Sequence, residues 1–116
     1  MSTLDVQLES GHDISTVKLS GELDISTAKE VEAVLFELEG GAGPTRIVVD
    51  LSDVSFMDST GLRLLVTADL RLRRDGRELR LIPGPEVVHR VFRLALLEER
   101  LTFVDGDRNG DGTEGA

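Results

Sequence analysis

Cysteine, tryptophan and tyrosine are all missing from this 116-residue chain, and phenylalanine occurs only four times. Without cysteine the chain can form no disulfide, offers no thiolate nucleophile and binds no metal through sulfur. Four aromatic rings are too few for a platform on which nucleic-acid bases stack. No apolar run approaches the ~18 residues of a membrane span, and no basic stretch followed by an apolar segment opens the chain. We therefore expect a cytoplasmic protein that does not enter a membrane.

Basic residues are also scarce, because 13 lysines and arginines face 22 acids and leave a formal net charge of −9. This balance argues against direct binding of nucleic acid. The charge is unevenly distributed: residues 1–58 hold 12 acids and 3 bases, whereas residues 59–104 hold 6 acids and 9 bases. The length fits one domain, which we place at residues 1–104. Residues 105–116, rich in glycine and acid, are expected to form a disordered acidic tail.

Hydrophobic periodicity predicts an α/β fold. Alternating apolar residues predict an N-terminal β-hairpin over residues 4–19, and helical spacing predicts three helices. The first opens with the capping-box spacing of Thr27 and Glu30 and ends at Gly40-Gly41. The remaining predicted segments are a strand at 47–49 covered on both faces, a helix that follows Asp58-Ser59-Thr60-Gly61 and stops near Asp75-Gly76, a strand at 79–82, a helix with Val88, Val91, Phe92 and Ala95 on one face, and a closing strand at 101–104. We expect a mixed sheet of four or five strands with helices packed on it.

Sites for catalysis or metal binding find little support in the sequence. There is no G-x-S-x-G elbow and no glycine-rich phosphate loop ending in Lys-Ser/Thr. His12 and His89 are expected at the surface. The tail carries the first positions of a calcium loop from Asp105 onward, but its twelfth position, where a glutamate is needed, is Ala116. We expect no catalytic residue, no metal site and no enzymatic activity.

Ser59 is the residue that the sequence singles out. It follows an apolar strand, adjoins Asp58 and stands where a helix begins, so one interpretation is a helix N-cap. The helix after it has two apolar stripes. One packs on the sheet and contains Gly61, Leu64, Leu65, Ala68 and Leu72.

The second stripe lies on the opposite face of the same helix, beside the Ser59 hydroxyl. It contains Val66 and Leu70, with Leu62 at its margin and Arg63 between them. A helix that covers a sheet needs only one apolar stripe. Exposed apolar rows often mark interaction surfaces, so we predict a partner-binding surface here; the alternative is that another segment of the chain buries the row.

A phosphate on Ser59 would act as a switch at this surface. It would add about −1.5 to −2 charges at pH 7. Arg63, one helical turn along, could pair with it, whereas Asp58 or a docked acidic or apolar partner would repel it. Phosphorylation would then dissociate a complex without unfolding the chain.

These residues resemble the STAS domain, in particular stand-alone bacterial anti-sigma-factor antagonists. The resemblance covers residues 1–104. Its most specific segment is 51–62, LSDVSFMDSTGL, which resembles the family's phosphorylation-site signature; residues 21–24, GELD, resemble its second signature. By this resemblance the partner-binding surface includes Asp24, Asp58, Ser59, Thr60 and Gly61.

The resemblance also implies a function by partner switching. The unmodified protein would bind an anti-sigma factor that is also a serine kinase, and so free a sigma factor. That kinase would phosphorylate Ser59 with its own ATP and magnesium, and a serine phosphatase would reset the switch. The chain itself would need no cofactor and would be monomeric when free. Two alternatives stay open: a STAS subunit of a lipid-transport or stress-signalling assembly that is never phosphorylated, and a small nucleotide-binding domain or enzyme.

Overall fold

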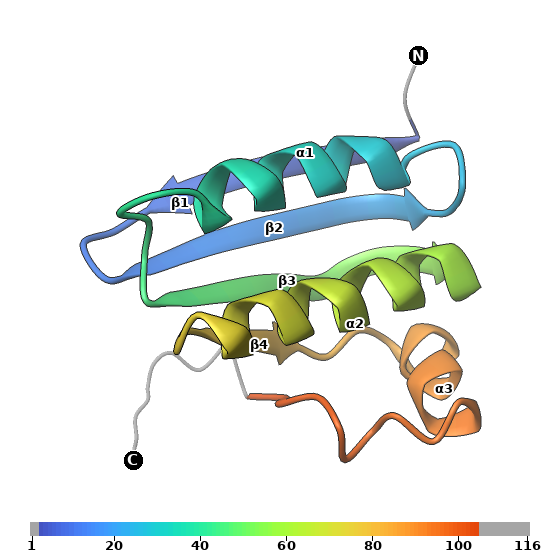
Figure 1. The fold of residues 1–116 in the computed structure, drawn as a ribbon. Helices are drawn as coiled ribbons and strands as arrows, with labels where there is room; N and C mark the ends of the chain where they lie inside the picture. The colour runs from blue at the N-terminus through green and yellow to red at the C-terminus, as the bar shows by residue number, and fades with distance from the viewer. Residues whose placement is uncertain (1–2, 105–116) are drawn as a thin grey trace.

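The computed structural model describes residues 3–104, which form one sheet of four strands and three helices (Figure 1). Along the chain the elements are β1 (Leu4–Ser10), β2 (Ile14–Leu23), α1 (Ala28–Glu39), β3 (Arg46–Met57), α2 (Ser59–Arg74), β4 (Glu78–Ile82) and α3 (Glu86–Leu94). The predicted α/β class with an N-terminal hairpin is confirmed.

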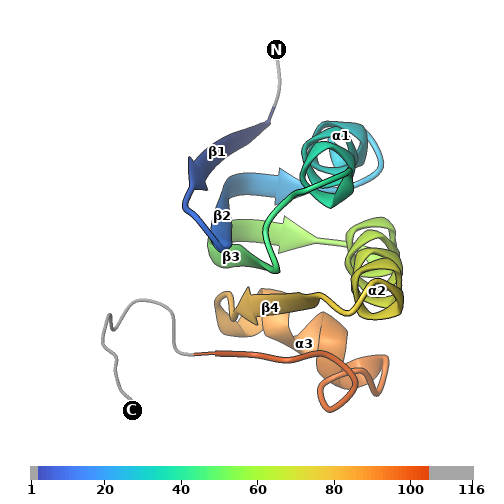
Figure 2. The ribbon, with the colours of Figure 1, turned by 60° about the vertical axis from the view of Figure 1, so that its left-hand side comes forward.

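The strands lie in the order β1-β2-β3-β4; the first pair is antiparallel and the other two pairs are parallel. In the hairpin Val6 lies opposite Leu19, so the apolar side chains of both strands point to the same face. The crossovers β2-α1-β3 and β3-α2-β4 step across the sheet in the same direction. Because such crossovers are right-handed, they place α1 and α2 on one face of the sheet, as Figure 2 shows.

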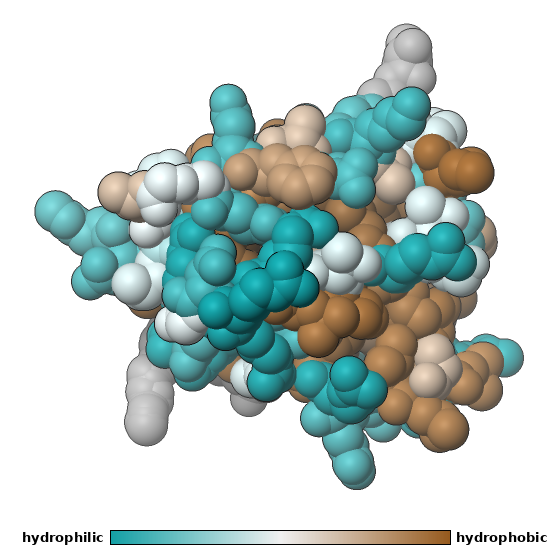
Figure 3. Space-filling model, in the orientation of Figure 1, coloured by the Kyte–Doolittle hydropathy of each residue, from teal (hydrophilic) through white to brown (hydrophobic). Residues whose placement is uncertain are grey.

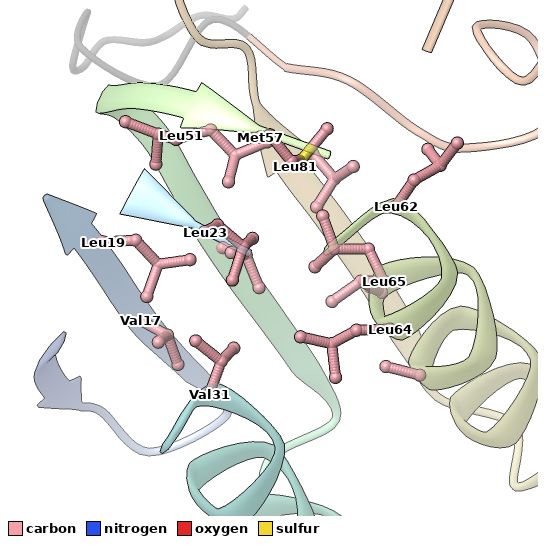
Figure 4. Close-up of a cluster of buried hydrophobic side chains, with 14 of the residues drawn as sticks. Val17, Leu19, Leu23, Val31, Leu51, Met57, Leu62, Leu64, Leu65 and Leu81 are labelled. Atoms are coloured by element: carbon pink, nitrogen blue, oxygen red, sulfur yellow. The ribbon is translucent and has the colours of Figure 1, made fainter. Parts of the chain in front are cut away.

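The hydrophobic core fills the layer between this face and the two helices (Figure 4). The apolar face predicted for α1 is confirmed, since Val31 and Leu35 are fully buried. The sheet-facing stripe predicted for α2 is confirmed as well, with Leu65, Ala68 and Leu72 fully buried. Both helices therefore pack on the sheet through the apolar faces that were predicted from the spacing of their hydrophobic residues.

Two predictions about strands need correction. Residues 47–49 were expected to be covered on both faces, yet Val48 is only half-buried between the buried Ile47 and Val49. The reason is that α1 and α2 lie on the same face. The predicted strand at 101–104 forms a single parallel bridge, between Leu81 and Phe103, so the sheet described by residues 3–104 has four strands.

The third predicted helix is confirmed, but it is shorter than its apolar pattern suggests. Val88 and Phe92 are buried and Val91 packs partly against the core, where α3 contacts β3. Ala95 was expected on the same face; instead it follows the last helical residue and is exposed.

The predictions for residues 105–116, an acidic tail and an incomplete calcium loop, lie outside the described residues. Within residues 3–104 none of the helices combines the length and the apolar character needed to cross a membrane.

Candidate functional site

The two segments that the sequence singles out meet at one edge of the sheet. Strands β2 and β3 are parallel neighbours, and their last residues, Leu23 and Met57, are paired in register. Asp24 and Asp58 follow directly, and the Asp58 amide donates to the Leu23 carbonyl at 3.3 Å. The loop before α1 and the start of α2 are therefore side by side (Figure 1).

The N-cap of α2 is Asp58 and not Ser59. Asp58 has extended backbone angles, and its Oδ1 accepts a hydrogen bond from the Thr60 amide at 2.9 Å. Capping therefore explains the aspartate and leaves the serine unexplained. Ser59 is exposed, and its hydroxyl has no hydrogen-bond partner within residues 3–104. The structure thus presents a free hydroxyl to solvent.

Asp24 shapes the neighbouring loop. Its Oδ1 accepts hydrogen bonds from the Ser26 hydroxyl at 2.7 Å and from the Ser26 amide at 3.0 Å. The Ser26 hydroxyl bond, helped by the amides of Ser26 and Thr27, lowers the pKa of the Asp24 carboxyl below its ordinary value. A stable negative charge therefore stands at the same edge as Ser59.

Ile25, at the tip of this loop, is a candidate contact residue that the sequence argument missed. Its side chain is 77% exposed between the polar Asp24 and Ser26. A lone apolar residue inside a polar loop was the available signal. Its exposure adds an apolar contact beside Asp24.

The capping box predicted at Thr27 does not form. The Thr27 hydroxyl donates to the Glu22 carbonyl at 2.8 Å and accepts from the Asp24 amide at 3.0 Å, and it makes no cap bond to α1. The side chain is buried, so it closes the loop from inside. Thr27 thereby fixes the Asp24–Ile25 segment rather than the helix end.

A hollow of about 260 Å³ lies between the first turns of α1 and α2. It is lined by Ile25, Ala28, Lys29, Glu32, Thr60, Arg63, Leu64 and Thr67. Of the predicted site residues, Thr60 and Arg63 reach it. Lys29 and Arg63, which make no ion pair with any described residue, line this hollow together with Glu32.

The second apolar stripe of α2 is largely absent from the surface. Leu62 was predicted at the partner-binding surface, but it is 8% exposed and belongs to the core, where Figure 4 labels it. Val66 is half-buried against the core, and Leu70, 48% exposed, is the member of the row that remains open. α2 contacts α3 as well as α1 and the sheet, and a helical wheel of α2 alone does not reveal these neighbours.

Close packing, and not exposure to a partner, explains why residue 61 is a glycine. A Cβ atom at this position would lie 2.7 Å from Leu23 Cγ and 2.9 Å from Met57 Cγ. The absent side chain lets the first turn of α2 approach the ends of β2 and β3 closely. Gly61 therefore positions Ser59 without being exposed itself.

Neither histidine lines the hollow between α1 and α2 or forms a hydrogen bond with Asp24 or Ser59. His12 is exposed in the turn between β1 and β2, as expected. His89 was expected at the surface too, but it is half-buried against the rings of Phe92 and Phe103, with Nε2 2.8 Å from Glu98 Oε2. Among the described residues no group of three or more His, Cys, Asp or Glu side chains is placed to hold a metal ion.

Comparison with known proteins decides the family. A sequence model of the STAS domain matches residues 5–106. The chain belongs to the STAS-domain family. This STAS domain is 32% identical over 103 residues to the anti-sigma-B factor antagonist of Staphylococcus aureus, an alignment that covers 89% of this chain and 94% of the relative. The protein of the same name from Staphylococcus epidermidis is also 32% identical, with the same coverage.

Solved structures share the fold of this STAS domain. An anti-sigma factor antagonist from Mycobacterium paratuberculosis superposes with a TM-score of 0.81 at 24% identity, covering 91% of this chain and 89% of that one. The anti-sigma factor antagonist SpoIIAA in its unphosphorylated form gives a TM-score of 0.75 at 24% identity, covering 90% and 92%. SpoIIAA from Bacillus has also been solved in a phosphorylated form, with a TM-score of 0.72, 22% identity and coverage of 90% and 96%.

Proposed function

We propose that this STAS domain is an anti-sigma-factor antagonist that works by partner switching. The unphosphorylated protein binds an anti-sigma factor that is also a serine kinase, and so frees a sigma factor. Phosphorylation of Ser59 ends the complex, and a serine phosphatase restores the binding form. The kinase supplies ATP and magnesium, so this chain needs no cofactor and acts as a binding protein rather than an enzyme.

The observation that carries the proposal is the free hydroxyl of Ser59. It is exposed, it has no partner among the described residues, and the adjacent Asp58 already caps α2. A side chain that the fold does not use is available for modification. The curated relatives, named anti-sigma-B factor antagonists, support the kind of partner, and the two SpoIIAA forms support phosphorylation as its control.

Electrostatics explain how the modification would release the partner. A phosphate adds about −1.5 to −2 charges at pH 7, beside the carboxylates of Asp24 and Asp58. A partner that docks against these carboxylates would meet this additional negative charge and the unfavourable desolvation of the phosphate. The fold stays intact because the cap bond from Asp58 to Thr60 does not involve Ser59.

Incubation with the cognate kinase and ATP tests the acceptor. We expect one phosphate, located at Ser59 by mass spectrometry, and none on Ser59→Ala. Ser55→Ala is the matched control, because Ser55 is an exposed serine on β3 and should leave phosphorylation unchanged. Normal phosphorylation of Ser59→Ala would contradict the proposal.

A charge at position 59 tests the release. Ser59→Asp should weaken binding to the unmodified kinase roughly tenfold or more, because like charges juxtaposed at an interface cost several kcal/mol. Ser59→Asn has the same shape without the charge and should bind much more tightly than Ser59→Asp. Equal affinities for the two variants would show that charge does not control the complex.

We also propose that the free protein is monomeric and acts in the cytoplasm, where the proposed kinase and sigma factor would meet it. Light scattering after size exclusion should give the mass of one chain, 12.6 kDa. A stable dimer at micromolar concentration would overturn the monomer.

A further inference from the structure

The turn that ends α3 holds a leucine in a backbone conformation that favours glycine. The amide of Leu97 donates to the Phe92 carbonyl at 2.9 Å, and the amide of Leu96 donates to the Arg93 carbonyl at 3.1 Å. This pair of bonds is the Schellman motif, whose left-handed residue is usually glycine. Here that residue is Leu96, with φ of +60°. Glycine, which has no Cβ atom, would adopt this backbone conformation at a lower energy than leucine.

The Leu96 side chain does not stabilise the fold by packing. It is 85% exposed, and Leu94, two residues earlier, is 75% exposed. The apolar contact of this turn with the core comes instead from Leu97, which packs against the core cluster. Two leucines therefore project from the end of α3, one of them at an unfavourable backbone angle.

A hollow of about 280 Å³ adjoins Leu96 and is lined by Arg93, Leu96, Glu98 and Glu99. Its one cation is already neutralised, because Arg93 is paired with Glu86. Glu98 contacts His89, and Glu99 has no ion-pair partner within residues 3–104. The hollow is therefore acidic, with an apolar rim.

The apolar rim continues toward α2. Figure 3 shows hydrophobic side chains gathered over α3 and along the neighbouring part of the α2 face, on the side of the molecule where α1 and α2 lie. Leu70 of α2 is also exposed. A partner seated at the start of α2 can thus reach the end of α3 without crossing to the other face of the sheet.

We propose that the turn Leu94–Leu97 and its acidic hollow form a second contact site for the anti-sigma factor. The site would receive a segment that presents an arginine or lysine beside an apolar side chain. The cation's head group would meet Glu98 and Glu99, and its aliphatic stem and apolar neighbour would cover Leu96 and Leu94. This inference rests on the proposed function, because it assigns the occupant to the same partner.

Two substitutions at one position separate binding from stability. Leu96→Gly removes the side chain and relieves the backbone, so it should raise the melting temperature and weaken anti-sigma-factor affinity roughly fivefold or more, as measured by calorimetry. Leu96→Ala removes most of the side chain but keeps the Cβ; affinity should fall similarly without the gain in stability. Leu8→Ala, which trims an exposed leucine of β1, should leave affinity unchanged.

The acidic hollow has its own test. Glu99→Lys should weaken the complex, whereas Glu9→Lys, an equal charge change on exposed β1, should have a much smaller effect. Wild-type affinity in Leu96→Gly and Glu99→Lys would overturn this second site while leaving the proposed function in place. Loss of a wild-type dimer in Leu96→Gly, with unchanged affinity for the anti-sigma factor, would overturn it in favour of a second copy of the chain. Failure of the wild type to bind any anti-sigma factor would overturn both proposals.

Discussion

Asp58 and Ser59 are neighbours at the start of α2, yet only the side chain of Asp58 forms a hydrogen bond that stabilises the helix start. The Asp58 carboxylate satisfies the Thr60 amide, one of the unpaired donors of a helix start, while the Ser59 hydroxyl faces solvent. This division lets one residue hold the helix and the next carry a modification. A change of charge at position 59 can then alter binding with little effect on folding.

The division predicts unequal costs of truncation. Asp58→Ala should lower the free energy of unfolding by about 1 kcal/mol through loss of the cap. Ser59→Ala should change it by less than about 0.5 kcal/mol, as for other exposed sites. Urea denaturation of both variants measures the difference. Equal losses would mean that Ser59 also stabilises the helix start.

Gly61 shows how a single missing side chain can position the site. Gly61→Ala would place a Cβ within 2.7–2.9 Å of the side chains of Leu23 and Met57. Overpacking of this kind typically costs about 1–3 kcal/mol, and it should displace the first turn of α2. Thermal unfolding should show the loss.

Gly40→Ala is the matched control for this prediction. Gly40 has an ordinary φ of −78°, and a Cβ there would meet its nearest atoms at van der Waals distance. Its melting temperature should stay close to that of the wild type. A stable Gly61→Ala protein would show that the α2 start adapts to the added methyl group.

At the scale of elements, α1 depends on a residue that lies far from it in sequence. The last turn of α1 contains no basic residue, so its free carbonyls lack a local cationic partner. Arg77, in the turn before β4, supplies one. Its guanidinium donates to the carbonyls of Leu38, Glu39 and Pro44 at 2.7–2.8 Å. One side chain thereby joins the end of α1 to the loop that enters β3.

Removal of the Arg77 guanidinium should destabilise both the end of α1 and the loop that enters β3. Arg77→Gln is expected to lower the free energy of unfolding by at least about 2 kcal/mol, since even one hydrogen bond from a charged donor contributes about 1.5–3 kcal/mol and Arg77 is half-buried. Arg77→Lys should recover little, because an ammonium cannot reproduce the planar fork. Arg74→Gln, at an exposed arginine without an ion pair among the described residues, should stay within about 0.5 kcal/mol. Urea denaturation measures these differences. An Arg77→Gln protein that unfolds at the same urea concentration as the wild type would contradict the prediction.

At the scale of the whole molecule, ionised carboxylates at separate places should make stability depend on pH. The hydrogen bond from Arg46 lowers the pKa of Glu78, and that from Arg93 lowers the pKa of Glu86. The Ser26 hydroxyl does the same for the pKa of Asp24. Each group binds its proton less readily folded than unfolded. The contribution of each carboxylate to the free energy of unfolding is therefore complete above its ordinary pKa. This contribution is lost as the pH falls through the lower pKa that the group has in the folded protein.

The melting temperature should accordingly fall as the pH is lowered below about 5. Glu78 forms ion pairs with Arg46 and Arg80 across β3 and β4, so Glu78→Gln should remove part of this acid dependence. Glu9→Gln, at an exposed glutamate of β1 that forms no ion pair with any described residue, should leave the profile unchanged. Calorimetric scans over this range measure the slopes. An identical slope in Glu78→Gln would contradict the prediction.

Local patterns in the sequence predicted the elements and suggested a position for the candidate switch. Alternation and helical spacing depend on which face of an element is apolar, and this information lies within each segment. The same holds for the start of α2 after Asp58, because helix starts have a local chemical signature. The longer β3, the single bridge at Phe103 and the short α3 differ from prediction because strand pairing and helix ends depend on contacts with distant segments.

The sequence by itself determined the α/β order of the elements, their core faces and the segment 58–61 as the candidate switch. Only the tertiary structure decided which side chains remain outside. It buried Leu62 beneath neighbouring elements, assigned the cap to Asp58, brought Asp24 to the same edge and left Leu96 in solvent. The physical reason is that periodicity gives the direction of a side chain relative to its own element. Exposure is set by which other elements pack against that element, and these come from elsewhere in the chain.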